Sequence, residues 1–202
     1  MIILPYHDKR RNQRPAFPFR LAAAFLAAFI ALAMAGEAHA QVAAAASSGG
    51  FGLSVGATGS GEYVQYGERK MVGVTGFVDF DTHRLNLGVE GEARFVQFLQ
   101  TDNLYFSTYS AGVRYRHNFG HLQPYVKGLL GEGYFNFPYN LATGHYMVIT
   151  AGGGVDYRLG HSRFHLRAAD AEWQYWPGFT FGTKTTPLTN LGVSTGIRVN
   201  IP

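Results

Sequence analysis

The sequence predicts an all-β fold, an eight-stranded antiparallel up-and-down transmembrane β-barrel preceded by a signal peptide. A long apolar run follows a basic N-terminus, and the rest of the chain alternates between apolar and polar residues in eight stretches. The connections between these stretches are alternately short and long. Alternation with a period of two residues indicates strands whose two faces meet different surroundings.

Residues 1–40 have the organisation of a secretory signal peptide. A basic segment comes first, residues 21–35 form an apolar run, and Ala38-His39-Ala40 provides a small-residue cleavage site. The apolar run is short for a membrane-spanning helix, although an uncleaved anchor is the alternative. We expect cleavage near Ala40, a flexible lead-in over residues 41–50 and the barrel over residues 51–202.

The signal peptide explains the basic character of the chain. It contains five of the 17 Lys and Arg residues and two of the 13 Asp and Glu residues, which leaves 12 basic and 11 acidic residues in the mature chain. Nucleic-acid binding therefore loses its main support. The chain has no cysteine, which excludes a disulfide scaffold, a zinc–thiolate site and a cysteine nucleophile.

The clearest predicted strand lies at residues 85–98. Leu87, Val89 and Phe95 share one of its faces, and Glu90 and Arg94 share the other. Further predicted strands lie at residues 51–59, 71–80, 107–117, 122–135, 147–159, 163–176 and 188–201.

The alternation slips in the predicted strand at residues 163–176. A β-bulge near Ala168 and Ala169 would return the polar residues that follow to the polar face. The alternative is a strand without clean alternation.

The polar faces predict which side of the wall is buried. They carry charges of both signs together with many glycines, which suits the crowded interior of a narrow barrel, whereas the apolar faces suit lipid. Aromatic residues end the apolar faces, as expected for interfacial girdles: Phe95, Tyr115, Tyr157, Trp173 and Tyr175. We expect a connected ionic network in the lumen, built from Glu90, Glu92, Arg94, Arg114, Arg116, Lys127, Asp156, Arg158, Arg167, Asp170, Glu172 and Arg198.

The connections agree with a membrane barrel. Tight turns are predicted at residues 81–84, 118–121 and 160–163, and longer segments at residues 60–70, 99–106, 136–145 and 177–187. Short turns at one end and long loops at the other are typical of outer-membrane barrels.

Three segments carry a family resemblance. Residues 123–133 (QPYVKGLLGEG), 152–158 (GGGVDYR) and 191–198 (LGVSTGIR) resemble the small bacterial outer-membrane β-barrels of the OmpA/OmpX type. The resemblance implies an outer-membrane location, contact with outer-membrane lipid and insertion by the barrel-assembly machinery. The family usually ends in an aromatic residue that this machinery reads, whereas this chain ends in Asn200-Ile201-Pro202.

The sequence predicts no catalytic, cofactor or metal site. His83, His117, His121 and His161 lie in or beside the short turns, where separate turns rarely bring metal ligands together. The paired carboxylates of the polar faces do not suit glycosidase chemistry. Neighbouring arginines would hold both carboxylates ionised, so neither could donate a proton as a general acid.

The predicted function is a non-enzymatic, structural, adhesive or interaction role carried by the long loops, with side chains filling the lumen. One alternative is a lipid-modifying enzyme, for which His145 with Ser107 or Thr108 is better placed than His161-Ser162. Another is a soluble barrel that binds a small apolar ligand, and its interior would be apolar. The sequence does not identify an extracellular partner.

Overall fold

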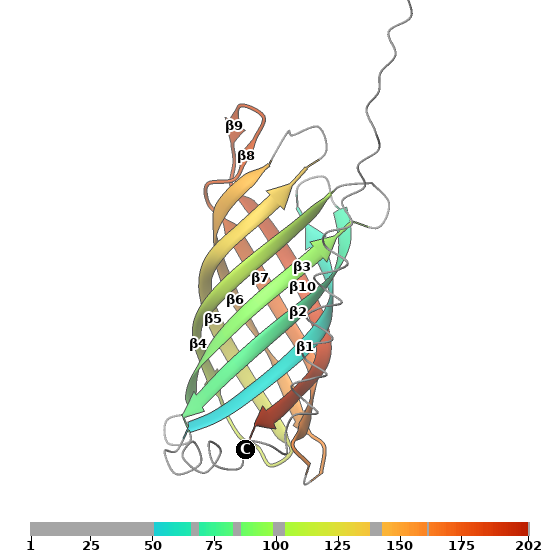
Figure 1. Ribbon diagram of the computed structural model, residues 1–202, viewed down its shortest axis with the longest axis vertical. Helices are drawn as coiled ribbons and strands as arrows, with labels where there is room; N and C mark the ends of the chain where they lie inside the picture. The colour runs from blue at the N-terminus through green and yellow to red at the C-terminus, as the bar shows by residue number, and fades with distance from the viewer. Residues whose placement is uncertain are drawn as a thin grey trace, which may run out of the picture.

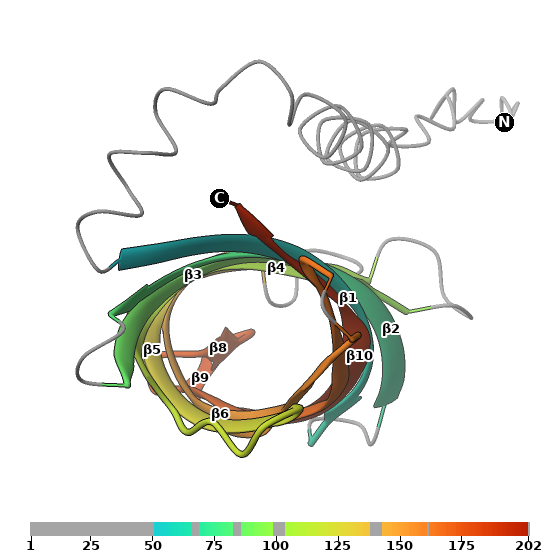
Figure 2. The same ribbon diagram turned by 90° about the horizontal axis from the view of Figure 1, so that it is seen from below.

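A computed structural model describes residues 51–65, 69–82, 86–98, 104–137, 143–160 and 162–201. Over these residues the chain forms a closed antiparallel barrel of eight strands (Figures 1 and 2). The barrel strands are β1 (Phe51–Val64), β2 (Arg69–Thr82), β3 (Leu87–Gln97), β4 (Tyr105–Arg116), β5 (Leu122–Asn136), β6 (Gly144–Arg158), β7 (Phe164–Trp176) and β10 (Leu188–Ile201).

Some of the predictions lie outside the described residues. They are the signal peptide at residues 1–40, the lead-in at residues 41–50, the turn residues His83 and His161, and residues 99–103 and 138–142 of two predicted long segments. Within the part of the chain that the structure describes, no helix has the length and apolar character needed to cross a membrane.

Each barrel strand pairs with the next along the chain, and the first strand pairs with the last. The β1–β10 register runs from Val64 opposite Asn190 to Leu53 opposite Ile201. Because this pairing closes the sheet, the long strands leave no free edge at which another chain could add.

The strands joined by the predicted short turns meet at one end of the barrel. β2, β4 and β6 end, and β3, β5 and β7 begin, at the end near the C-terminus, which we call the turn end (Figure 1). Gly120 and Gly160 have positive φ values of 63° and 61° there, a conformation that glycine adopts without strain. We call the opposite end the loop end.

Two predicted long segments contain more strand than expected. The prediction of a loop over residues 60–70 is wrong, because β1 continues to Val64 and β2 begins at Arg69. Glycines lower strand propensity in this stretch, but pairing with both β2 and β10 keeps it extended. The segment at residues 177–187 contains a small hairpin, β8 (Thr180–Phe181) and β9 (Lys184–Thr185), which rises beyond the barrel wall (Figure 1).

The predicted bulge in β7 is confirmed. Val155 pairs with Ala169, but the next residue, Asp156, pairs with Arg167, so Ala168 is an extra residue in β7. The register between β7 and β10 shifts at the same place. As a result, both Arg167 and Asp170 face the lumen and are buried.

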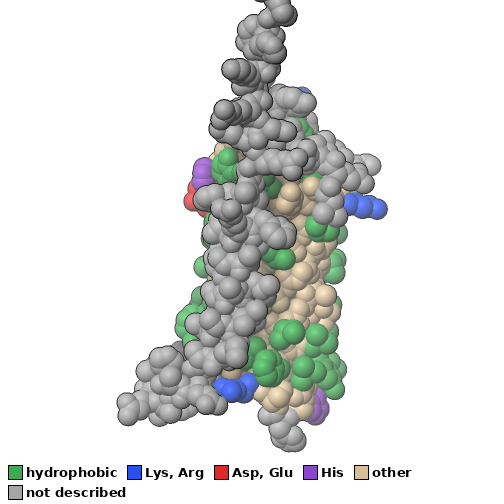
Figure 3. All heavy atoms as spheres, turned by 45° about the vertical axis from the view of Figure 1, so that its right-hand side comes forward, with side chains coloured by type: hydrophobic (Ala, Val, Ile, Leu, Met, Phe, Trp, Pro, Cys, Tyr) green, Lys and Arg blue, Asp and Glu red, His purple; other side chains and the backbone are tan. Residues whose placement is uncertain are grey.

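The outer face of the wall is apolar. Figure 3 shows hydrophobic side chains along the visible part of the barrel, with charged side chains near its two ends. Exposed aromatic residues lie towards both ends of the strands, among them Tyr115 and Tyr157 at the turn end and Trp173 at the loop end. This distribution matches an apolar band between two aromatic girdles.

Candidate functional site: a layered barrel lumen

Glycines on the inward face make room for the large polar side chains of the lumen. A Cβ atom at Gly192 would lie 2.5 Å from Glu62 Oε2, and one at Gly154 would lie 2.7 Å from the Tyr125 hydroxyl. In contrast, an added Cβ on the outward-facing Gly59 or Gly128 would meet nothing within 4 Å. The alternation of glycine with charged residues along the polar faces therefore has a steric cause.

The centre of the lumen is organised around Lys127. Its Nζ atom lies 2.9 Å from Glu90 Oε1, 2.5 Å from Glu92 Oε1, 2.8 Å from Asp170 Oδ2 and 2.6 Å from Glu172 Oε1. Oxygen atoms of Glu90, Glu92 and Asp170 lie within 4.8 Å of one another, a spacing that could also hold a metal ion. The lysine ammonium lies among these carboxylates and supplies the cation itself.

Arg94 connects this centre to the loop end of the lumen. Its Nη1 donates to Glu62 Oε1 at 2.9 Å, and its Nη2 pairs with Glu172 and lies 3.5 Å from Glu92 Oε2. All four side chains are almost fully buried. A charge buried in this way must be paired, because an isolated one is strongly unfavourable.

Two further arginines extend the network towards the turn end. Arg114 pairs with Asp79 and lies 2.8 Å from Asp156 Oδ2, while Arg167 lies 3.2 Å from Asp156 Oδ1. The two guanidinium groups also lie over the Tyr125 ring, at 4.0 Å and 4.8 Å from its centroid. Such cation–π contacts stabilise desolvated cations.

Arg198 and Arg116 complete the network at the turn end. Arg198 lies 3.1 Å from Asp156 Oδ2 and donates to Gln123 Oε1 at 3.1 Å. Arg116 pairs with Asp81 at 2.9 Å and is partly exposed. Asp81 and Arg116 also line a small pocket that opens at this end.

The structure joins eleven of the twelve predicted residues in one connected set of ion pairs, in which Arg116 is linked to Arg198 through Asp81. The prediction is wrong for Arg158, which is exposed. Arg158 is the last residue of β6, so its side chain lies beyond the wall, although alternation along the strand predicts that it faces the lumen. Alternation identifies the face of a strand but does not show where the barrel ends.

Three acidic members of the network were missed: Glu62, Asp79 and Asp81. Asp79 could have been found, since it alternates with the apolar Val78 and Phe80. Glu62 and Asp81 lie in segments that the sequence predicts as a loop and a turn, where alternation along a strand predicts no inward face.

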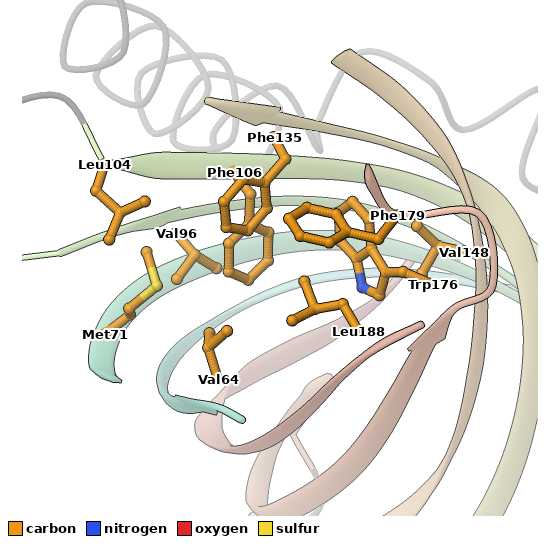
Figure 4. Packing of buried hydrophobic residues seen from close by; sticks show 10 residues of the cluster. All are labelled: Val64, Met71, Val96, Leu104, Phe106, Phe135, Val148, Trp176, Phe179 and Leu188. Carbon is orange, nitrogen blue, oxygen red and sulfur yellow. The ribbon is translucent and has the colours of Figure 1, made fainter. Parts of the chain in front are cut away.

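An apolar cap fills the lumen at the loop end, a layer that the sequence analysis did not predict. Its buried residues come from all eight barrel strands and two connecting segments: Val64, Met71, Val96, Leu104, Phe106, Phe135, Val148, Trp176, Phe179 and Leu188 (Figure 4). The Trp176 ring lies edge-on to Phe106 and Phe135, with centroids 5.7 and 6.0 Å away. Each such aromatic pair contributes about 0.5–1.5 kcal/mol beyond the area it buries.

The histidines do not form a metal site with one another in the described part of the chain. His117 and His121 are exposed at the turn end, where His117 packs on Phe119 and His121 lies 3.3 Å from the Arg158 carbonyl. His165 is buried and faces the lumen.

Among the histidines that the structure describes, His145 forms an ion pair with a carboxylate, since its Nδ1 lies 2.7 Å from Glu132 Oε1 on the outer face near the loop end. Thr108 faces the lumen, on the other side of the wall. Ser107 is separated from His145 by Tyr134 in the strand register. The proposed partners for an enzymatic His145 are therefore not in contact with it.

Comparison with known proteins identifies the fold class. The solved structure of Neisserial surface protein A (NspA) aligns with a TM-score of 0.55 and 15% sequence identity over 74% of this chain and 96% of that one. Ail, the attachment invasion locus protein of Yersinia pestis, aligns with a TM-score of 0.47 and 17% identity over 74% of this chain and 97% of Ail. The N-terminal β-barrel domain of Pseudomonas aeruginosa OprF aligns at 0.42 and 18%, over 71% of this chain and 96% of the domain.

The fold is that of the eight-stranded outer-membrane β-barrels of the OmpA/OmpX type. No protein-family model matches the chain, and no curated protein matches it.

Proposed function

We propose that this chain is a non-enzymatic protein of the bacterial outer membrane. A cleavable signal peptide at residues 1–40 directs it out of the cytoplasm, and the barrel-assembly machinery inserts the barrel in outer-membrane lipid. The barrel serves as a closed anchor, and the segments at its loop end carry a structural, adhesive or interaction role. No cofactor is required.

The filled lumen is the observation that carries this proposal. Ion pairs cross the interior of the barrel. Arg94 of β3 pairs with Glu172 of β7, a strand on the opposite side of the barrel, and Lys127 of β5 pairs with both Glu172 and Glu92 of β3. The apolar cap closes the lumen beyond them. An eight-stranded barrel is just wide enough for its own side chains, so a conducting pore is not expected.

Two measurements test the proposal. Fractionation of cells that produce the full chain should recover it in the outer membrane, and unheated samples should migrate differently from heated ones on a denaturing gel. Planar-bilayer recording of the purified barrel should show no sustained ohmic conductance. Recovery in the soluble periplasmic fraction would contradict the location, and a large, stable conductance would contradict the closed anchor.

The soluble small-ligand barrel is not favoured by the structure. That function requires an apolar interior and a charged exterior, whereas here the charges lie in the lumen and apolar side chains cover the wall.

A lipid-modifying enzyme is the second candidate, because the Glu132–His145 pair lies on the outer face. A carboxylate that orients an imidazole is one part of nucleophilic catalysis, but a hydroxyl nucleophile must also contact the imidazole. Within the described residues, none of the hydrogen bonds joins a hydroxyl to His145. Release of fatty acid from an ester phospholipid by the reconstituted barrel, lost in His145→Gln, would make this the leading function.

A further inference from the structure

We propose that the outer face of β4–β6 at the loop end binds the sugar headgroup of a glycolipid in the outer leaflet. The site, which we call the polar patch, consists of Tyr105, Ser107, Tyr109, Glu132, Tyr134 and His145. This inference rests on the outer-membrane location proposed above.

The strand register brings the polar patch together. Ser107 of β4 lies opposite Tyr134 of β5, and Tyr134 lies opposite His145 of β6, so these three residues form one row across the wall. In the adjacent row, Tyr109 lies opposite Glu132. On β4 and β5 these residues alternate with inward-facing lumen residues, and His145 lies between the partly buried Gly144 and Tyr146, so all of them face outward.

Side-chain contacts hold the polar patch in a defined arrangement. His145 Nδ1 lies 2.7 Å from Glu132 Oε1, and both side chains are about two-thirds exposed, at 67% and 66%. The Tyr134 ring lies 5.0 Å from the His145 ring, and the Tyr105 ring lies 6.1 Å from that of Tyr134. The contact uses one oxygen of Glu132 and one ring nitrogen of His145, which leaves the second oxygen and the second nitrogen for hydrogen bonds to a ligand.

The position of Glu132 is unusual for this barrel. Among the acidic residues that the structure describes, it alone lies outside the lumen network. Leu130, two residues along β5, is exposed on the same apolar face. Because a charge that faces hydrocarbon is costly, the pair belongs at the level of the lipid headgroups, beside the aromatic residues of the girdle.

The chemistry of the polar patch matches a neutral sugar better than a phosphate. Sugar hydroxyls both donate and accept hydrogen bonds, as do the phenols of Tyr105 and Tyr134 and the hydroxyl of Ser107, while the Glu132 carboxylate accepts. The tyrosine rings offer apolar faces to the C–H groups of a sugar ring. The polar patch contains no Lys or Arg, and its carboxylate would repel a phosphate.

The experiment measures glycolipid retention by the intact barrel. The mature chain is reconstituted in phosphatidylcholine nanodiscs that contain monogalactosyl diacylglycerol as a neutral sugar probe, or phosphatidylglycerol as an anionic probe without a sugar. Native mass spectrometry then counts the lipids that stay bound to the released barrel. Heat-modifiability on a gel confirms folding for each variant.

We expect the wild-type barrel to retain the galactolipid in preference to phosphatidylcholine. Glu132→Gln should reduce this retention about tenfold, because a hydrogen bond to a charged acceptor becomes one to a neutral acceptor. Tyr134→Phe keeps the ring and should reduce retention about threefold. The matched control is Lys70→Gln, which changes an exposed side chain on β2 at the same end and should leave retention unchanged.

Other outcomes separate the failure of this inference from that of the proposed function. Equal galactolipid retention by the wild type, Glu132→Gln and Tyr134→Phe would overturn the sugar site while the barrel stays inserted. Retention of phosphatidylglycerol that depends on His145 would replace the sugar with a phosphate ligand and also overturn it. Failure of the wild type to enter any bilayer would instead overturn the outer-membrane location.

Discussion

The indole of Trp176 lies in the space that a side chain at position 133 would need. A Cβ atom built on Gly133 would come within 2.3 Å of Trp176 Cη2. The two residues belong to β5 and β7, with β6 between them. Gly133 of β5 therefore makes room for the Trp176 ring of the apolar cap, which extends from β7, two strands away.

Gly133→Ala should destabilise the barrel by about 1–3 kcal/mol, because the new methyl group must displace the Trp176 ring or the backbone. Urea unfolding in lipid vesicles, followed by tryptophan fluorescence, measures the change. Gly128→Ala is the matched control on the same strand, since its methyl group would point into open space. An equal loss of stability in both variants would mean that the general effect of Gly→Ala on strand β5, rather than contact with the cap, explains the result.

Arg94→Leu should lower the free energy of unfolding by about 3–5 kcal/mol, since Glu62 and Glu172 lose their shared partner inside the lumen. The control is Leu87→Met on the exposed outer face of β3, which should cost less than about 1.5 kcal/mol. Equilibrium unfolding of both variants in the same lipid makes the comparison. The prediction fails if the two losses are the same.

Arg158 and Arg198 should respond differently to the same substitution. Arg158 is exposed at the end of β6, so Arg158→Gln should stay within about 0.5 kcal/mol of the wild type. Arg198 is buried against Asp156, and Arg198→Gln should cost about 3–5 kcal/mol. Paired thermal or urea unfolding curves distinguish the two variants. A large loss of stability in Arg158→Gln would mean that Arg158 belongs to the lumen network after all.

Trp176→Ala should remove about 3–5 kcal/mol of stability, because the ring is fully buried among Phe106, Phe135 and Tyr146. It should not produce a pore, since the ion pairs around Lys127 still cross the lumen. Planar-bilayer recording of the folded variant checks this second part. A stable ohmic conductance would show that the apolar cap alone closes the barrel.

Val193→Arg places a charge on the exposed apolar face of β10 and should cost about 2–4 kcal/mol in a bilayer if it lies near the midplane. Thr186→Arg, in the exposed segment beyond β9, should change stability by no more than about 0.5 kcal/mol. Both are measured by unfolding from lipid vesicles. If Val193→Arg is as harmless as Thr186→Arg, the face of β10 does not contact hydrocarbon.

Alternation along the chain was enough to predict eight strands, their inward and outward faces and the bulge at Ala168. These features are local, because successive side chains of a strand point to opposite sides whatever the strand pairs with. The same alternation placed Glu90, Arg94 and Lys127 on the lumen side.

The tertiary structure decided the height of each inward side chain and therefore its partners. Lys127 meets Glu92 and Glu172 only because the registers of β3, β5 and β7 bring them to one level of the closed barrel. Arg158 is two residues after Asp156 and on the same face of β6, but it lies beyond the wall, where facing the barrel axis does not bury a side chain.

The apolar cap and the polar patch also depend on the strand registers, which set the height of each side chain along the barrel. Val96 and Phe106 belong to lumen-facing alternations, and only pairing across β3 and β4 places them together at the loop end. Glu132 and His145 are 13 positions apart in the sequence and become neighbours through the hairpin of β5 and β6. Sequence alternation is a property of single strands, whereas contacts between strands require the closure and stagger of the whole sheet.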